Sequence, residues 1–358
     1  MLVYITTLVL VLGSVGLSKF SGSVLLSRMF RFLGLAILVL VGGLRDRAVG
    51  TDSGNYVRAF ERSGGFFDSA NLAVGTGEYG YWILNWLVYC ISDQYVFMFL
   101  SIAIIVVGCY HYSICRYSLN IPLSYYIFIT LGFYTFFYNG ARQGIACAIC
   151  TLSIGSLLRG EFKKYLLIVL FAALFHKTAL IMLPLYFLLR KKNSLQTNFL
   201  FGVLGFFTAF SLSYIVDTIS QFDSRFQGYA TAGQGGGIYM SAVNVLFWLS
   251  FYLFKNLVPS NRRDYYDIFL NMLLFSAVIS LISIVLHINP SGVLRLTMYF
   301  NIGVIFLFPV CYESFANKGS KLAFISVTGV FLFAYFVMTT SRFSQLVPYK
   351  LNTSFSLL

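Results

Sequence analysis

Long apolar stretches separated by short polar connections dominate this sequence. Twelve such stretches lie at about residues 2–17, 30–44, 95–110, 121–138, 141–158, 165–175, 178–189, 199–219, 239–255, 266–287, 292–312 and 322–340. A membrane-spanning helix needs about 20 apolar residues. Charged residues make up 10% of the 358 residues, whereas soluble domains contain about 25%. The pattern predicts an all-α polytopic integral membrane protein with about 12 transmembrane or half-spanning helices, in a single transmembrane domain over residues 1–358.

The distribution of charge predicts the face on which each connection lies. The net charge is +13, and cytoplasmic connections of membrane proteins are enriched in Lys and Arg. With the N-terminus outside, 15 of the 25 Lys and Arg residues but only four of the 12 acids fall on the cytoplasmic face. The positive charge is therefore explained by topology, and no nucleic-acid partner is expected.

This topology places six segments on the extracytoplasmic face, at residues 45–80, 139–142, 176–177, 220–238, 287–291 and 341–358. Residues 45–80 form a long loop that leads into an interfacial segment, either amphipathic or re-entrant, near residues 81–91. Residues 220–238 contain a run of glycines without the Lys-Ser/Thr of a nucleotide-binding loop, so we interpret them as a flexible loop. Residues 165–189 have basic clusters on both sides, which favours a short helical hairpin with His176 and Lys177 at its tip over a single span.

Several cations are expected at the extracytoplasmic surface. Arg142 follows Asn139-Gly140 at the beginning of one apolar stretch, and Arg295 follows Pro290-Ser291-Gly292 at the beginning of another. Helix N-termini carry a partial positive charge, and Arg is suited to bidentate contacts with phosphate. These residues predict an anion site, although headgroup contacts at helix ends would also account for them. The further candidates for this site are Arg45, Arg47 and Lys177.

Four motifs in the first half of the chain resemble those of the EpsG-like membrane proteins. Arg45-Asp-Arg-Ala-Val-Gly-Thr-Asp52-Ser-Gly-Asn-Tyr56 resembles the family's Arg…Val-Gly-Thr-Asp…Tyr signature, and Glu78-Tyr-Gly-Tyr-Trp-Ile-Leu-Asn85 resembles its Glu-x-Gly-Tyr…Asn stretch. Asn139-Gly-Ala-Arg142-Gln-Gly-Ile-Ala resembles its Arg-Gln element, and Phe175-His176-Lys-Thr-Ala-Leu resembles its Phe-His element. Beyond Leu189 the match is weak, so Arg295 depends on topology alone.

The family groups with Wzy-type polymerases of O-antigen, capsule and exopolysaccharide. The resemblance implies a GT-C-like glycosyltransferase in the bacterial inner membrane, with its active site facing the periplasm or exterior. Its substrates would be polyprenyl-pyrophosphate-linked oligosaccharides, and it would transfer a growing glycan from its polyprenyl pyrophosphate onto a lipid-linked repeat unit. Membrane lipid would surround it, and a chain-length regulator and a flippase are candidate partner proteins.

This chemistry assigns roles to the candidate residues. His176 is the first choice for the base that takes the acceptor proton, with Asp52 or Glu78 as alternatives. Tyr56, Tyr81 and Asn85 would contact the glycan. No Asp-x-Asp pair occurs in the sequence, so the cations are expected to replace a divalent metal, and no cofactor is expected. The residues expected to bind the pyrophosphate are Arg45, Arg47, Arg142, Lys177 and Arg295.

Two other functions are compatible with such a chain. A flippase or transporter for a lipid-linked oligosaccharide usually shows inverted repeats and a site at the membrane midplane, and we find neither pattern in the sequence. A non-catalytic subunit of a polysaccharide export system is the other alternative.

Overall fold

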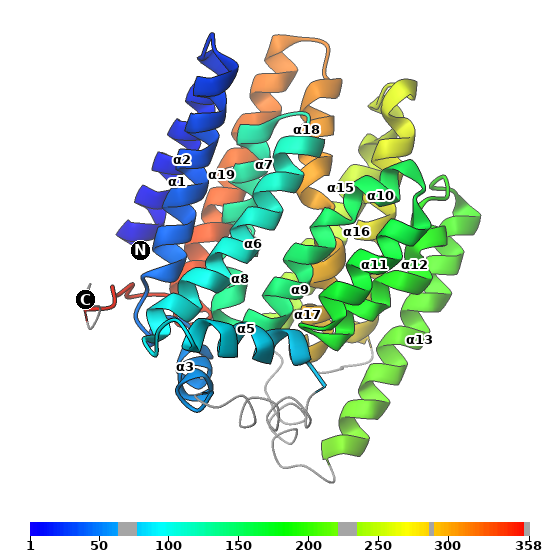
Figure 1. The fold of residues 1–358 in the computed structure, drawn as a ribbon. Helices are drawn as coiled ribbons and strands as arrows, with labels where there is room; N and C mark the ends of the chain where they lie inside the picture. The colour runs from blue at the N-terminus through cyan, green and yellow to red at the C-terminus, as the bar shows by residue number, and fades with distance from the viewer. Residues whose placement is uncertain (64–76, 221–234, 286–289, 354–358) are drawn as a thin grey trace. The chain divides into compact units, whose positions relative to one another are not determined.

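The computed structural model describes residues 1–63, 77–220, 235–285 and 290–353, and the regular elements within these residues are all helical (Figure 1). In this part of the chain, nine helical segments are long and apolar enough to cross a membrane. They are Leu2–Phe20, Val24–Gly43, Tyr95–Tyr117, Ile121–Asn139, Ala141–Arg159, Ile238–Leu257, Ser260–Val285, Arg295–Ser314 and Lys318–Arg342. The prediction of an all-α polytopic membrane protein is confirmed.

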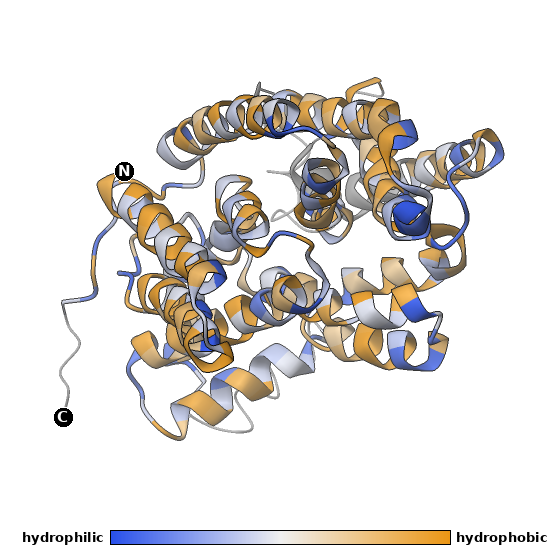
Figure 2. Cartoon of the chain, turned by 90° about the horizontal axis from the view of Figure 1, so that it is seen from above, coloured by the Kyte–Doolittle hydropathy of each residue, from blue (hydrophilic) through white to orange (hydrophobic). Residues whose placement is uncertain are grey.

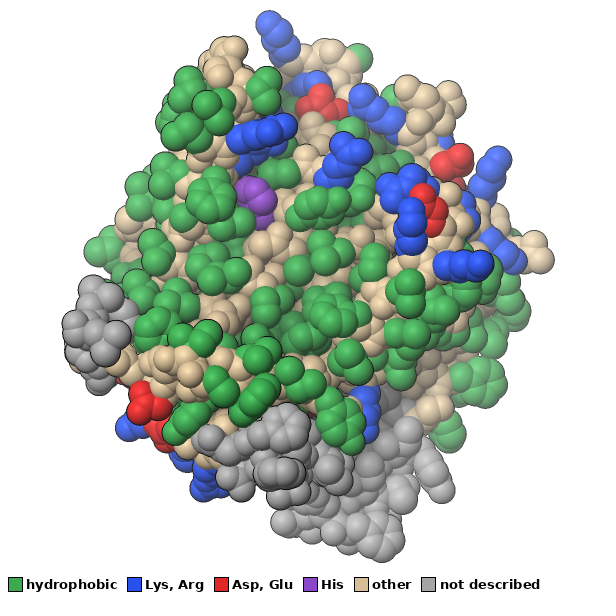
Figure 3. Space-filling model, in the orientation of Figure 1, with side chains coloured by type: hydrophobic (Ala, Val, Ile, Leu, Met, Phe, Trp, Pro, Cys, Tyr) green, Lys and Arg blue, Asp and Glu red, His purple; other side chains and the backbone are tan. Residues whose placement is uncertain are grey.

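The helical contacts divide the chain into two compact units. The first unit contains Met1–Ser156, Glu161–Ile181 and Asn317–Leu358, and the second contains Leu157–Gly160 and Met182–Ala316. Apolar residues predominate along the helices, and hydrophilic residues concentrate in the connections (Figure 2). In the view of Figure 3, hydrophobic side chains cover most of the helix surfaces, while Lys and Arg gather near helix ends. A lipid environment explains the exposed apolar surface. The single transmembrane domain stays a prediction.

The first unit is a bundle in which neighbouring helices pack in series. α1 packs against α2, α2 against α6, α6 against α9, and α9 against α11, while α7 contacts both α1 and α19. The elements of this unit are α1 (Leu2–Phe20), α2 (Val24–Gly43), α3 (Ser53–Glu61), α5 (Tyr79–Tyr89), α6 (Tyr95–Tyr117), α7 (Ile121–Thr130), α8 (Phe133–Asn139), α9 (Ala141–Leu152), α11 (Phe162–Ala173), the 3₁₀ helix η1 (Lys177–Ile181) and α19 (Lys318–Arg342); α10 (Ile154–Arg159) lies at the boundary of the two units.

The position of α9 in the bundle follows from its small residues. The candidate span that begins with α9 is 83% buried. Small side chains let membrane helices approach closely, and α9 reads Ala-Arg-Gln-Gly-Ile-Ala-Cys-Ala-Ile-Cys. At Gly144 an added Cβ would lie 2.6 Å from the Cβ of Phe137, which belongs to α8. A larger residue at this position would therefore force α8 and α9 apart. The tight packing holds the first turn of α9, which carries Arg142, in a fixed position.

The second unit is organised around α16. This helix (Arg263–Val285) contacts α12 (Met182–Leu189), α13 (Leu195–Ser220), α15 (Gly235–Phe254), α17 (Pro290–Asn301) and α18 (Val304–Ser314), and short 3₁₀ helices occur at Lys255–Leu257 and Ser260–Arg262. Asn244 donates a hydrogen bond of 3.0 Å to Ser280, and Asn301 donates one of 3.0 Å to Asn244. Buried hydrogen bonds of this kind join membrane helices.

The structure modifies several predicted segments. The predicted span 121–138 is divided into α7 and α8 at Gly132, which has φ +79°. Helix α11 ends at Ala173, the chain turns at Leu174–His176, and η1 begins at Lys177. The predicted hairpin over 165–189 includes residues of both units and stays a prediction. Most of the predicted flexible loop 220–238 lies outside the described residues, and residues 235–238 begin α15.

The segment predicted to be interfacial forms the short helix α5, and its position at the membrane surface stays a prediction. Its 11 residues extend about 16 Å at 1.5 Å per residue, which is too short to cross a membrane. In Figure 1 it lies across the ends of neighbouring helices of the unit rather than alongside them. Glu78, directly before α5, is therefore held at the end of the bundle.

Candidate functional site

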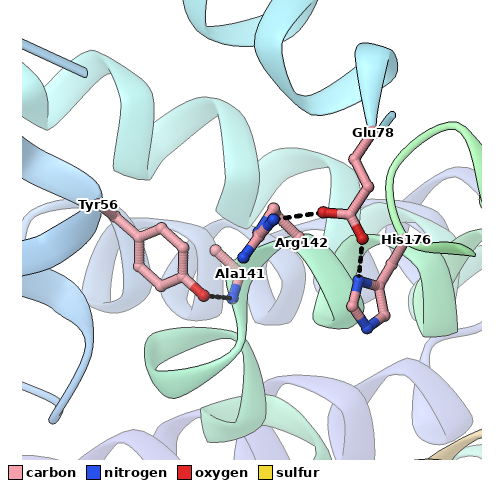
Figure 4. A network of polar contacts seen from close by, with 5 residues as sticks. All are labelled: Tyr56, Glu78, Ala141, Arg142 and His176. Carbon is pink, nitrogen blue, oxygen red and sulfur yellow. Dashed lines mark hydrogen bonds and ion pairs between the residues drawn. The ribbon is translucent and has the colours of Figure 1, made fainter. Parts of the chain in front are cut away.

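A single carboxylate joins three segments of the first unit. The Glu78 Oε1 atom lies 2.6 Å from Nδ1 of His176, and Oε2 forms an ion pair with a guanidinium nitrogen of Arg142 (Figure 4). Glu78 is 7% exposed, His176 25% and Arg142 34%. The carboxylate is thus shielded, while parts of the imidazole and the guanidinium remain accessible.

Close backbone contact brings Glu78 to His176. The N–H of Gly80, in the first turn of α5, donates a 2.9 Å hydrogen bond to the carbonyl of Leu174. A Cβ on Gly80 would lie 3.0 Å from the Cβ of Leu174 and 3.1 Å from its carbonyl. Glycine therefore permits this contact, and the turn that carries His176 is held beside the beginning of α5.

Arg142 is oriented by the beginning of α9. The first N–H groups of a helix lack partners within the helix, and here the N–H of Ala141 donates to the hydroxyl of Tyr56 at 3.0 Å (Figure 4). The Tyr56 ring contacts the Tyr81 ring edge-to-face, with 6.0 Å between their centroids. Tyr56 is therefore a structural support of the turn before Arg142, in addition to its predicted contact with glycan.

The ion pairs determine the protonation of Glu78. Burial raises the pKa of this carboxyl, but the hydrogen bond and charge of His176 and the charge of Arg142 outweigh burial and hold the pKa below its usual value. Because an ionised carboxylate can only accept hydrogen bonds, Nδ1 of His176 must carry the proton in this contact. In Figure 4 the other ring nitrogen points away from Glu78. In a neutral imidazole that Nε2 is a proton acceptor.

Lys177 adds a second cation beside the backbone that leads to Glu78. An added Cβ on Gly77 would lie 2.6 Å from the Lys177 Nζ atom, so the amino group lies over the backbone directly before Glu78. Gly77 has φ +63°, a conformation that favours glycine. Lys177 is exposed. The structure therefore brings together four of the predicted residues, Glu78, Arg142, His176 and Lys177.

Arg45 is an exception to the predicted anion site. Its side chain is fully buried, with the guanidinium carbon 3.8 Å from the ring centre of Phe99 and 4.2 Å from that of Tyr138. One guanidinium nitrogen donates to the carbonyl of Gly42. Contacts within about 6 Å of an aromatic ring stabilise a cation. In this conformation Arg45 cannot contact a pyrophosphate, and it instead fixes the end of α2 against the bundle.

The remaining predicted residues lie outside the group around Glu78. Arg47 is exposed and pairs with Glu61 at 3.9 Å. Tyr81 and Asn85 are buried on α5, so in this conformation they support the fold rather than contact a glycan. Asp52 directly precedes α3. Arg295 lies on α17 in the second unit. The roles of Asp52 and Arg295 stay predictions.

Hydrogen bonds that the sequence did not predict hold the loop at residues 45–52 in place. The N–H and the hydroxyl of Thr51 both donate to the side-chain oxygen of Asn139, at 2.6 and 2.9 Å. The segment after α19 also holds this loop, because Asp46 N–H donates to the carbonyl of Lys350 and Gly50 N–H to that of Gln345. Asn139 stood in a recognised motif, whereas the role of the C-terminal segment had no sequence signal.

These contacts show that the predicted extracytoplasmic segments of the first unit meet at one end. Residues near 45–52, 139–142 and 344–352 are joined by hydrogen bonds, and Glu78 joins Arg142 to His176. Far from this end, Lys19 in the last turn of α1 donates to Asn120 before α7 at 3.1 Å. Both of these residues lie in connections predicted to be cytoplasmic. In the described part of the chain, no three His, Cys, Asp or Glu side chains gather as a metal site.

Comparison with known proteins supports the assignment from the sequence motifs. No curated protein and no solved structure matches the chain significantly. The model of the EpsG family matches residues 29–351. This match includes Glu78, Arg142, His176 and nearly all of the helices described above. The chain is a multi-pass membrane protein that belongs to the EpsG family, which is linked to exopolysaccharide biosynthesis.

Proposed function

We propose that the chain is a membrane glycosyltransferase that polymerises lipid-linked repeat units at the periplasmic or exterior face of the bacterial inner membrane. The main supporting observation is the Glu78 carboxylate shared by His176 and Arg142, at the end of the first unit where the predicted extracytoplasmic segments meet. A base, a cation and an orienting carboxylate are the groups that glycosyl transfer from a pyrophosphate requires.

His176 is the proposed base. Glu78 fixes the tautomer in which Nδ1 carries the proton and Nε2 is free to accept one. During transfer, a hydroxyl oxygen of the acceptor sugar forms a bond with the anomeric carbon of the donor glycan, and its proton passes to Nε2. The bond between that carbon and the pyrophosphate oxygen breaks, and its electron pair leaves with the lipid pyrophosphate. Glu78, first considered as an alternative base, is better suited to orienting His176 and stabilising its charged form.

Arg142 and Lys177 are the proposed pyrophosphate ligands of the first unit. The leaving group gains negative charge as the glycosidic bond breaks, and fixed cations stabilise such charge. Arg142 uses one nitrogen for Glu78 and is one-third exposed, so other donors of its guanidinium can face a ligand. Arg295 of the second unit stays a candidate third cation. The substrate is tethered to the membrane, and a site at the end of the bundle matches its expected depth.

The proposal is tested by extension of defined polyprenyl-pyrophosphate-linked repeat units by the purified protein, with a chelator present and without ATP. We expect a ladder of longer glycans from the wild type. His176→Ala and Arg142→Ala should each lower the rate of extension at least about 100-fold. Arg58→Ala is the matched control, because Arg58 is an exposed arginine on α3 that contacts only Asn55 in the described structure.

The extension assay, together with a measurement of lipid movement between vesicle leaflets, separates the alternative functions. A flippase would move labelled lipid-linked oligosaccharide between leaflets of a vesicle without lengthening it, and a non-catalytic export subunit would do neither. Full extension activity in both the His176 and the Arg142 variants would rule out the proposed site.

A further inference from the structure

An open groove lies on the first unit, away from the group around Glu78. Its volume is about 1010 Å³, and its walls come from α2 between Leu26 and Ala36 and from His111 and Cys115 of α6. Apart from two arginines, every α2 residue that lines it is apolar, and large side chains such as Met29 and Phe32 are exposed there. The groove therefore offers apolar surface to the bilayer together with a small number of polar groups.

The charged groups of the groove are cationic. Arg28 and Arg31 both line it, and no Asp or Glu does. Among the residues that the structure describes, neither arginine takes part in an ion pair. Arg31 donates to the backbone carbonyl of Ser27 at 3.2 Å and is also hydrogen-bonded to the Cys115 side chain of α6, so its known partners are uncharged. Two arginines without an acidic partner create a positive potential that favours an anionic ligand.

The order of charged and apolar residues along α2 matches the shape of a lipid. α2 begins at Val24, so at 1.5 Å per residue Arg28 and Arg31 lie about 6 and 10 Å from its beginning. Leu33 and Ala36 lie about 14 and 18 Å from it. The cations are thus at the depth of headgroups, and the apolar wall continues into the depth of the acyl chains. A free phosphate ion would use the first part of this groove and leave the second empty.

The groove is also separated from the proposed transfer site. Arg31 lies about 18 Å along the helix axis from Gly43, the last residue of α2, and the segments that hold Glu78, Arg142 and His176 lie beyond that end. The connection between α1 and α2 is predicted to be cytoplasmic, because Lys19, Arg28 and Arg31 follow the first span. A lipid in this groove would therefore be in the opposite leaflet from the polyprenyl pyrophosphate.

We propose that this groove binds an anionic phospholipid of the cytoplasmic leaflet, with its phosphate at Arg28 and Arg31 and an acyl chain along the wall that ends at Ala36. Basic pockets between helices on the cytoplasmic side are suited to anionic headgroups. A bound lipid would fill the hollow between α2 and α6. This site does not depend on the proposed transferase activity.

The test is lipid retention by the purified full-length protein. Delipidated protein in detergent is mixed with equal amounts of phosphatidylglycerol and phosphatidylcholine, and native mass spectrometry measures the fraction bound to each. We expect the wild type to retain phosphatidylglycerol preferentially. Arg28→Gln combined with Arg31→Gln should lower that retention about 30-fold, since two arginines near anionic lipid together contribute roughly 2 kcal/mol, while the phosphatidylcholine signal stays unchanged.

Two further variants make the result specific. Ala36→Trp removes no charge but fills the apolar part of the groove, so it should also lower phosphatidylglycerol retention. Arg58→Gln combined with Arg62→Gln removes two exposed arginines, one on α3 and one directly after it, and should have no effect. Equal retention of the two lipids by the wild type, or an equal loss in the α3 control, overturns the proposal. So does displacement of phosphatidylglycerol by inorganic phosphate with no effect of Ala36→Trp, which would indicate a site for the free ion.

Discussion

At the scale of single residues, the shared carboxylate of Glu78 fixes the orientation of two functional side chains. Nδ1 of His176 and a guanidinium nitrogen of Arg142 occupy its two oxygens. Removal of one member from a buried ionic group leaves its partners without compensation. In the proposed reaction Glu78 would therefore act through the tautomer of His176 and the direction of Arg142, as a positioning residue.

Replacement of Glu78 by Gln should lower glycan extension without loss of the protein from the membrane. The amide can still contact His176, but it no longer requires Nδ1 to carry the proton, so a larger share of the imidazole has the wrong tautomer. We expect a fall of about 100-fold or more in the extension rate. Glu61→Gln is the matched control, because Glu61 is exposed and pairs only weakly with Arg47, at 3.9 Å. Equal rates in the two variants would contradict this role.

The pairing of Glu78 should also give stability a defined pH dependence. The folded-state pKa of Glu78 is below its ordinary value of 4.5, so the unfolded chain binds the proton more tightly. The pairing therefore stabilises the protein above about pH 4.5, and this contribution is lost as pH falls below that value. We expect the difference in Tm between the wild type and Glu78→Gln in nanodiscs to be largest near pH 7 and to narrow toward pH 4. A constant difference would show that Glu78 remains charged throughout or does not stabilise the fold.

Sequence reasoning placed these residues at one surface but could not assign their contacts. The resemblance and the charge of the connections brought Glu78, Arg142 and His176 to the same face. The assignment of Glu78 as the residue that orients His176 depends on the 2.9 Å backbone contact between Gly80 and Leu174, which no local pattern encodes. Arg45 was placed in the anion site because it lies at the outer end of the second predicted span. Its burial depends on Phe99 and Tyr138, which are distant in sequence.

At the scale of elements, the 45–52 loop is held between α8 and the segment that follows α19. Gly50 is central to this arrangement, with φ +103° and a hypothetical Cβ only 2.9 Å from Asn139 Oδ1 and 3.1 Å from the carbonyl of Tyr138. Both the backbone conformation and the space exclude a side chain. The loop therefore has one conformation that satisfies its contacts with Asn139.

Gly50→Ala should destabilise the protein by about 1–3 kcal/mol, because alanine is strained at this φ and collides with Asn139. Gly54→Ala is the matched control. Gly54 lies within α3, where a Cβ would have its nearest neighbour 3.9 Å away, and alanine favours the helix by roughly 0.5–1 kcal/mol. Thermal unfolding in nanodiscs should therefore shift in opposite directions for the two variants. A Tm of Gly50→Ala at or above the wild-type value would contradict this view of the loop.

Element boundaries were predicted where the chain carries a clear local signal. Ser92-Asp93-Gln94 after the apolar segment at 81–91 indicated a short interfacial helix, and α5 ends at Tyr89. The basic clusters around 165–189 likewise indicated a hairpin. The break at Gly132 was missed, because an isolated glycine within an apolar run usually stays within a helix, and its φ of +79° depends on the packing of α7 and α8.

At the scale of the whole molecule, apolar residues cover surfaces that would face water in a soluble protein. In the apolar part of α2, 17% of the residues are buried, and the same fraction is buried in α19. These two helices therefore face lipid. The all-helical membrane fold was therefore predictable from hydropathy alone. The division into two units was not, because both units contain helices of the same apolar character.

The predicted orientation can be tested at the two ends of α19. Lys318 is the first residue of α19 and is predicted to be cytoplasmic. Lys350 lies in the segment after Arg342, the last residue of α19, and is predicted to be extracytoplasmic. In a variant without native cysteines, a membrane-impermeant maleimide added to intact cells should label Lys350→Cys. Lys318→Cys should react only after the membrane is opened. The reverse pattern would invert the topology and place the Glu78 group in the cytoplasm.

The segment after α19 has a consequence for biosynthesis. Leu346 and Lys350 accept hydrogen bonds from Tyr4 and Asp46, and Asn352 donates to Leu44, so this segment is joined both to α1 and to the loop that follows α2. These contacts can form only once α19 is in place, because the segment is connected to its end. The 45–52 loop must therefore reach its described conformation late in folding, after α19 has inserted.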